Sequence, residues 1–442
     1  MHSLPSTPAE VLDISTRGLR FRINMAVKAA ELFGYWRHPY RDAATSFEEM
    51  TLSDIYYWVY KCTNPITRPE QGERIADQMV TDSRVAALPH GFETQSSLTI
   101  GAGGDLLQAD GLAQSKDLLF ESIADLLFDQ TVSYANFESP ITTQPLQKEV
   151  IGDRAAPIQC CSREQFDVLK GHRGKCFTVL NTANNHMFDM GVEGVETTTR
   201  VLAEHDILDT GTNGRPDEHG QGKFLTSNDI KLGLVSATFG LNGHVMPPGD
   251  EHRINVTTLL SKFSKPDLRL IKRQIDHCKD QGCDFIIASL HWGFEFEFFP
   301  RRQQVEIAHT LVEWGADAII GHHAHVIQPV EYYRTRRDPS RIAVIAYSVG
   351  TLVWGYTAPH LVLGMILNLT LAKGLFQGKA RTYIEQARVT PVFRSSTSNE
   401  HGIVTRLEKL ADHVAGRRKL HSPDYIAGIK RYADLVLEHI PI

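Results

Sequence analysis

The sequence predicts an α/β protein, and three observations support this fold class. From Ser97 onward, short apolar, β-rich segments alternate with amphipathic helical segments, as strands joined by helical crossovers require. Residues 1–95 are helical and irregular in pattern, and residues 395–442 return to helical periodicity. The composition, with 42% hydrophobic and 22% charged residues, is that of an ordinary folded protein. We therefore expect a helical N-terminal extension (1–95), a central domain (96–394) and a C-terminal helical segment (395–442).

The individual elements follow from apolar runs and their periodicity. The strands expected in the central domain are 98–102, 132–135, 177–180, 231–237, 285–290, 316–320 and 342–346, with a later strand in 361–371. The expected helices are 115–128, 192–205, 267–281 and 303–314, followed by 403–414 and 424–439. Together these elements indicate a mainly parallel sheet with helical connections.

Charge and hydropathy narrow the classes of function. The net charge is −6, which disfavours a non-specific nucleic-acid binder. Residues 1–20 contain no apolar core of signal-peptide length, and the apolar runs 285–290 and 342–346 are too short to span a bilayer. None of the six cysteines forms a C-x-x-C pair, so no zinc ribbon is indicated. We expect a cytoplasmic protein with reduced cysteines, no membrane span and no nucleic-acid partner.

Residues able to bind a metal follow five of the expected strands directly. In an open α/β sheet, ligands bind beyond the carboxyl ends of the strands, so these side chains are expected to meet at one edge. Mixed oxygen and imidazole ligands suit Mn, Fe or Zn, and the number of groups suits two ions that share a bridging carboxylate. The candidate ligands are Asp105, Glu138, Asn185, His186, His291, His323 and His325.

Each candidate alone has a simpler explanation. Asp105 follows a glycine pair and could be a turn residue, and Asn184-Asn185 could cap a helix. Glu138 could be a solvated loop carboxylate, and His291 a hydrogen-bonded core histidine. The metal prediction therefore depends on all five strand ends together and not on any single residue.

Several ordered motifs resemble those of the CapA family, the poly-γ-glutamate capsule synthesis proteins. The matching stretches are GGDLL (103–107), ANFESPIT (135–142), ANNHMFDMGVEGV (183–195), LHWGFEFE (290–297), GADAIIGHHAHVIQPVE (315–331) and IAYSVGTLVW (345–354). The resemblance implies that 96–394 is a metallophosphatase-like domain of the calcineurin type. Its fold would be a layered β-sandwich flanked by helices, with helical N- and C-terminal extensions.

The resemblance also implies roles for individual residues. Asp105 and His325 would bind one ion, Glu138 would bridge, and Asn185, His291 and His323 would bind the second. His186 would protonate a leaving group, oriented by Asp189. Leu107 stands where the phosphatases usually have the histidine of Asp-x-His, so the first ion has one ligand fewer. The residues expected to contact substrate are Asn136, Asn184, His322, Arg301 and Arg302.

The expected function is a metal-dependent hydrolase of poly-γ-glutamate synthesis or processing, which uses a metal-activated water on a γ-glutamyl amide. Arg301, Arg302 and the basic stretch 334–341 could steer an anionic substrate, polyglutamate or a phosphate ester, although scattered solvated charge is the simpler explanation. One alternative is a phosphoesterase for a small metabolite or nucleotide. Another is a non-catalytic scaffold for a polyglutamate ligase, which would then be its partner.

Overall fold

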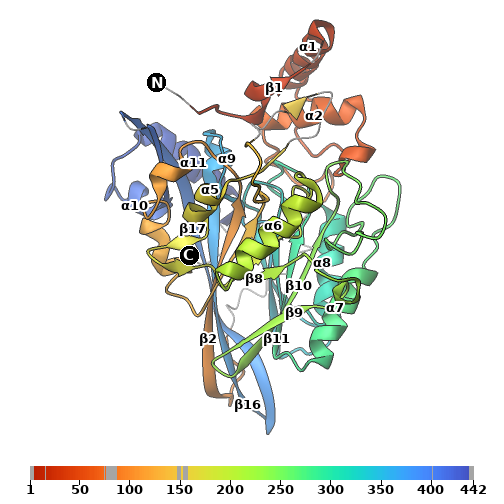
Figure 1. Cartoon of the computed structure of the whole chain (residues 1–442), viewed down its shortest axis with the longest axis vertical. Helices are drawn as coiled ribbons and strands as arrows, with labels where there is room; N and C mark the ends of the chain where they lie inside the picture. The colour runs from red at the N-terminus through yellow and green to blue at the C-terminus, as the bar shows by residue number, and fades with distance from the viewer. Residues whose placement is uncertain are drawn as a thin grey trace.

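Two β-sheets pack face to face, and helices cover the outer side of each (Figure 1). The computed structural model describes residues 4–14, 16–73, 75, 87–146, 151–152, 158–400 and 402–437. The core between the sheets joins Ile100 and Tyr134 of the first sheet to Leu232, Ile287 and Ile320 of the second. This arrangement confirms the layered α/β fold expected from the sequence.

The first sheet has the strand order β18-β17-β16-β2-β3-β7-β8, and β15 pairs with β2 beside this path. Strands β2, β3, β7 and β8 are parallel, whereas β16, β17 and β18 add antiparallel strands, so the sheet is mixed. Its strands are β2 (Glu93–Leu106), β3 (Val132–Phe137), β7 (Val179–Asn181), β8 (Leu208–Thr210), β15 (Thr351–Val353), β16 (Leu363–Phe376), β17 (Lys379–Asn399) and β18 (Gly402–Lys409).

The second sheet has the order β13-β14-β12-β11-β10-β9. Its four central strands are parallel, and the strands at its two edges, β9 and β13, run antiparallel to them. These strands are β9 (Lys223–Ser227), β10 (Ile230–Thr238), β11 (Phe285–His291), β12 (Ala318–His322), β13 (Val330–Arg334) and β14 (Ile342–Ala346). Two short pairs lie apart from the sheets: β1 (Leu12–Asp13) with β4 (Ile151–Gly152), and β5 (Gly171–His172) with β6 (Lys175–Cys176).

The helices bury one apolar stripe each. In α7, the side chains of Leu270, Ile271, Ile275 and Cys278 recur at helical spacing and are buried, mostly in the core cluster outside the second sheet. The helices are α1 (Arg17–Phe33), α2 (Leu52–Thr63), α4 (Ala124–Leu127), α5 (Arg163–Leu169), α6 (Gly191–Glu204), α7 (Arg269–Asp280), α8 (Arg302–Trp314), α9 (Pro359–Val362), α10 (Leu410–Val414) and α11 (Pro423–Leu437). No helix of the described ranges has the length and apolar character needed to cross a membrane.

Two helix predictions are wrong. Most of the helix expected over 403–414 is strand β18, because the long β17 offers a partner from Val392 to Asn399 and this pairing overrides the helical spacing of the apolar residues. Only α10 at its end is helical, and residues 395–399 belong to β17. The helix expected over 115–128 forms only in part, as a 3-10 turn at Glu121–Ile123 followed by the short helix α4. Asp117 adopts a left-handed φ of 57°, which ends helical geometry near the start of the range.

Candidate metal centre

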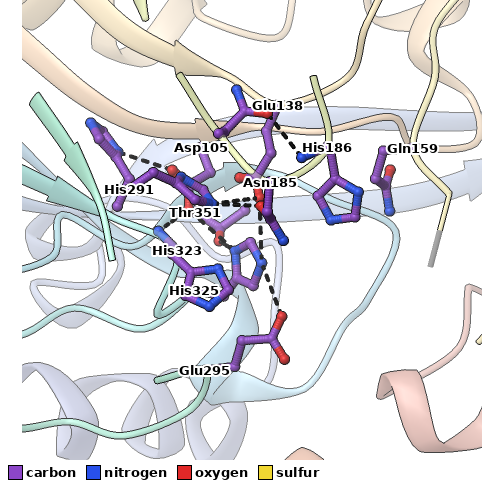
Figure 2. Close-up of polar contacts among 12 residues, drawn as sticks. Asp105, Glu138, Gln159, Asn185, His186, His291, Glu295, His323, His325 and Thr351 are labelled. Carbon is purple, nitrogen blue, oxygen red and sulfur yellow. Dashed lines mark hydrogen bonds and ion pairs between the residues drawn. The ribbon is translucent and has the colours of Figure 1, made fainter. Parts of the chain in front are cut away.

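Side chains from five strand ends meet at one edge of the two sheets (Figure 2). Asp105 is the second-to-last residue of β2, and Glu138 directly follows β3. Asn185 follows β7, His291 is the last residue of β11, and His323 comes just after β12. Because β2, β3 and β7 are parallel in the first sheet, and β11 and β12 in the second, the carboxyl ends of each set lie at one edge of its own sheet.

The buried carboxylates and imidazoles form two groups that share one residue. Glu138, His291 and His323 offer ligand atoms that all lie within 4.8 Å of one another, and so do Asp105, Glu138 and His325. The Nε2 atom of His291 lies 3.3 Å from Glu138 Oε1 and 2.7 Å from the Oδ1 atom of Asn185. Asn185 thus adds an amide oxygen to the first of these groups.

The backbone around these residues is held in unusual conformations. The N–H of Asp105 donates to the carbonyl of Gly350 (3.1 Å), and a Cβ on Gly104 would lie 2.0 Å from that same oxygen. Only glycine at position 104 permits this close approach. His323 and His325 adopt left-handed φ angles of 85° and 55°, which non-glycine residues seldom adopt outside functional sites.

Burial and mutual charge shift the pKa values of these groups strongly. Burial and the nearby Asp105 carboxylate raise the pKa of Glu138 to about 8. Burial also lowers the pKa values of His291 and His323, so both imidazoles are neutral and able to bind a metal. For His325, the Glu138 and Asp105 carboxylates outweigh burial and raise the pKa to about 9.

Two buried polar atoms test whether the site fits a metal. Glu138 Oε1 and the Nδ1 atom of His323 have no hydrogen-bond partner in the described part of the chain. Leaving such atoms unpaired costs free energy, and a cation between them would satisfy both. Two carboxylates, neutral imidazoles and an amide oxygen are together a donor set for a transition metal. The residues therefore fit the divalent ion that the sequence predicts.

His186 lies beside this centre (Figure 2), and its imidazole contacts the carboxylate of Asp189. Its Nδ1 atom lies 2.7 Å from Asp189 Oδ2, and the backbone N–H of Gln159 donates to the same oxygen at 2.7 Å. Asn242, in the loop after β10, contacts both Asn185 (2.9 Å) and His186 (3.3 Å). The Asp189 carboxylate therefore fixes the orientation of the imidazole.

Three residues expected to contact substrate lie behind the ligand groups instead. Asn136 donates to Asp105 at 2.9 Å, and His322 bridges Asp105 (2.9 Å) and the hydroxyl of Tyr134 (3.0 Å). Asn184 donates to the carbonyl of Phe137 at 2.8 Å. All three side chains are fully buried, so they hold the ligand residues in place.

The structure does not bring Arg301 and Arg302 to the metal edge. Arg301 is buried and makes a two-pronged ion pair with Glu297, at 3.1 and 2.9 Å. Arg302 pairs with Glu306 at 2.9 Å and with Glu73 at 3.4 Å. Both guanidinium groups pair with carboxylates of the same chain, and the expected contact of these arginines with an anionic substrate stays a prediction. In the basic stretch 334–341, several arginines likewise pair with Glu313 and Asp317.

Sequence reasoning missed Glu295 and Asn242. Glu295 Oε1 lies 3.9 Å from the Nε2 atom of His325 (Figure 2). The other carboxylate oxygen of Glu295 accepts a hydrogen bond from the indole N–H of Trp58. Glu295 stands in the LHWGFEFE stretch but not at a strand end, and Asn242-Gly243 carries only a turn signal. Neither position has a pattern that indicates a metal site.

The fold and the ligand groups define an α/β protein with a candidate two-ion centre at the carboxyl ends of its strands. Residues 99–356, more than half of the chain, match the family described as "Bacterial capsule synthesis protein PGA_cap". The chain belongs to this family, which confirms the resemblance seen in the sequence.

Two curated relatives and one solved structure show how far the similarity extends. The PGA biosynthesis protein CapA of Bacillus subtilis (strain 168) is 29% identical over 244 residues, 54% of this chain and 57% of the relative. The capsule biosynthesis protein CapA of Bacillus anthracis is 25% identical over 277 residues, 61% and 62% of the two chains. The matches thus span about three-fifths of these relatives. The calcineurin-like phosphoesterase YfkN from Bacillus subtilis has a TM-score of 0.38 at 14% identity, covering 78% of this chain and 99% of that one.

Proposed function

We propose that this protein is a metal-dependent hydrolase that acts on a γ-glutamyl amide in the synthesis or processing of poly-γ-glutamate. The observation that carries the proposal is the pair of buried ligand groups sharing Glu138 at the edge of the sheets. Membership of the capsule synthesis family supports the substrate, since relatives are named as poly-γ-glutamate and capsule biosynthesis proteins.

We assign the ligands in two sets. Asp105, Glu138 and His325 would hold one ion, and Glu138, Asn185, His291 and His323 would hold the other. The mixed nitrogen and oxygen donors favour Mn, Fe or Zn. When bound, two such ions supply Lewis-acid polarisation and make a nucleophilic water available at neutral pH.

The chain's own residues supply the proton for the departing nitrogen and orient the groups that take part in the reaction. His186 delivers a proton to the departing nitrogen, and Asp189 keeps its ring in one tautomer and one orientation. His322 and Asn136 fix the carboxylate of Asp105 from behind. These two are positioning residues, comparable to the outer hydrogen-bond partners that orient ligands in other metal sites.

Metal analysis combined with turnover tests the proposal. The purified protein, supplied with Mn or Zn, should bind one to two equivalents and hydrolyse a γ-glutamyl amide, and a chelator should abolish the activity. Arg302→Ala is the matched control, because Arg302 lies on the surface away from the ligand groups. Absence of bound metal after supplementation would overturn the metal assignment. Turnover of p-nitrophenyl phosphate or a nucleotide, with no amide hydrolysis, would assign a phosphoester and not an amide as the substrate.

A ligase partner and a cytoplasmic location complete the proposal. A relative from Mycobacterium tuberculosis (strain CDC 1551 / Oshkosh), 25% identical over 180 residues, is named a probable polyglutamine synthesis accessory protein. Co-purification of a polyglutamate ligase with the tagged protein would support a partnership. Metal-independent stimulation of that ligase, without hydrolysis, would favour the scaffold role. Recovery of the tagged protein in washed membranes would contradict the cytoplasmic location.

A further inference from the structure

A pocket of about 420 Å³ lies beside the ligand groups, and its lining has two parts. One part is polar and includes Asn185, His186 and His323. The other part consists mainly of apolar side chains between residues 12 and 59, among them Ile23 and Ile55. The helices α1 and α2, which carry much of this wall, lie at the top of Figure 1, beyond the upper ends of the central strands. The apolar wall is outside the segment that matches the family.

The apolar wall is fixed to the central domain by buried polar contacts of α2. Lys61 pairs with Glu297 at 3.3 Å, and the hydroxyl of Tyr57 donates to the same carboxylate at 2.9 Å. Trp58 donates to Glu295, whose other oxygen lies 3.9 Å from His325. The pocket is therefore formed before any ligand binds, and its volume is that of a small-molecule site.

The charges around the pocket do not suit a polyanion. Among the described residues that line it, Lys61 is the only lysine or arginine, and Glu297 already neutralises it. Glu295 adds a carboxylate. A row of glutamate carboxylates against the apolar wall would lose water without gaining a lysine or arginine partner, which is costly. An apolar group would instead gain about 25 cal/mol for each Å² that it buries.

We propose that the substrate is a γ-glutamyl amide with an apolar amine portion, and that this portion occupies the pocket; the inference rests on the function proposed above. His186, the proton donor to the departing nitrogen, lines the pocket, so the amine leaves on this side. Water adds its oxygen to the carbonyl carbon and the C–N bond breaks. The nitrogen takes a proton from His186. One proton of the water then restores His186 and the other protonates the amine, which gives a glutamate carboxylate and an ammonium ion. Glu295 attracts the amine once it is an ammonium ion.

The test compares two substrates that differ only in the amine, γ-glutamyl hexylamide and γ-glutamyl methylamide. We expect kcat/KM to be about 10²-fold higher for the hexylamide, since each buried methylene contributes to binding. Leu19→Asp and Ile55→Asp place a carboxylate in the apolar wall and should reduce this ratio toward one. Leu32→Asp is the matched control on α1, because Leu32 is 79% exposed and outside the pocket, and it should leave the ratio unchanged.

Binding of hexylamine to the metal-loaded protein, measured by calorimetry, separates the pocket from the chemistry. Equal hydrolysis of both amides by the wild type would overturn the apolar-amine inference while the hydrolase function stands. If neither amide is hydrolysed, the proposed hydrolase function fails. The binding of hexylamine then decides whether the pocket takes an apolar amine. Hexylamine binding that Leu19→Asp weakens at least tenfold would then support the pocket assignment. Absent binding, or tighter binding of a fatty acid than of hexylamine, would overturn it.

Discussion

Two buried acidic clusters lie close together in this protein and differ in how their charge is balanced. Glu297 pairs with Lys61 at 3.3 Å and with Arg301 at 2.9 Å, and it accepts a hydrogen bond from Tyr57. Asp105 and Glu138, in contrast, are surrounded by histidine and asparagine side chains and have no lysine or arginine partner among the described residues. Lysine and arginine side chains balance the charge of the first cluster, whereas histidine side chains pair with the second.

The pKa values of Glu297 and Glu138 shift in opposite directions, in line with this difference. Burial acts to raise the pKa of Glu297, but Arg301 and Lys61 outweigh it and keep the pKa below the usual range. For Glu138, burial and Asp105 both act in the same direction, and the pKa rises to about 8. A buried carboxylate with its own cations thus stabilises the docking of α2, and one without them is suited to bind a metal.

The largest expected effect comes from Glu138→Gln, which removes the shared carboxylate. The wild type should hold one to two equivalents of metal, and the variant nearly none, because both ligand groups lose a member. Amide turnover should fall to background for the same reason. Elemental analysis after dialysis measures the metal directly. Glu297→Gln, in the other cluster, is the matched control, and the metal content of this variant should equal that of the wild type. Equal metal loss in both variants would contradict the distinction between the clusters.

His186→Ala should slow turnover by about 10²–10⁴-fold, which is the usual contribution of a general acid. Metal content should stay at the wild-type level, because Asp189 and not the ligand groups holds the ring at 2.7 Å. Asp189→Asn should cause a smaller loss of rate, since it disturbs only the orientation of the imidazole. Loss of metal in His186→Ala would instead make His186 a ligand.

The candidate metal ligands could be predicted from the sequence because each one follows a predicted strand directly along the chain. Asp105 and Glu138 follow parallel strands of one sheet, so they could be grouped without knowing any distance. His291 ends a strand of the other sheet, and the prediction of a single sheet edge did not distinguish the two sheets. The pairing of Arg302 is written in the sequence, because Arg302 and Glu306 stand four residues apart within α8, a spacing that places two side chains side by side on a helix. Glu297 and Arg301 precede this helix, so their spacing alone does not indicate the contact that the structure shows.

Other features could not be predicted because they depend on contacts distant in sequence. The apolar pocket wall contains Ile23 and Ile55, whose neighbours across the pocket are about 130 residues or more away, such as His186. Strand β18 was predicted as helix, because Ile403, Val404 and Leu407 have helical spacing and only the pairing with β17 decides otherwise.

Glu297→Gln should destabilise the fold by about 3–5 kcal/mol, the usual cost of breaking a buried ion pair and leaving charge uncompensated. Lys61 and Arg301 would remain buried without their carboxylate partner. Denaturant unfolding of the metal-loaded protein measures the change. A loss below about 1 kcal/mol would show that solvent reaches this cluster, and the contrast with the metal centre would then weaken.

The smallest expected effect is on the free energy of unfolding at acidic pH. The pKa of Glu297 is lower in the folded chain than its ordinary value of 4.5, so its stabilising contribution is fully present above that value. The contribution is lost as the pH falls below 4.5 toward the folded-state pKa, because the unfolded chain takes up the proton first. Between pH 6 and pH 3.5, the wild type should therefore lose more unfolding free energy than Glu297→Gln, which has no proton to bind there. Unfolding curves at several pH values measure both slopes in metal-free buffer, so that metal release does not contribute. Parallel slopes would mean that the Lys61 and Arg301 charges do not act on Glu297 as the 3.3 and 2.9 Å distances imply.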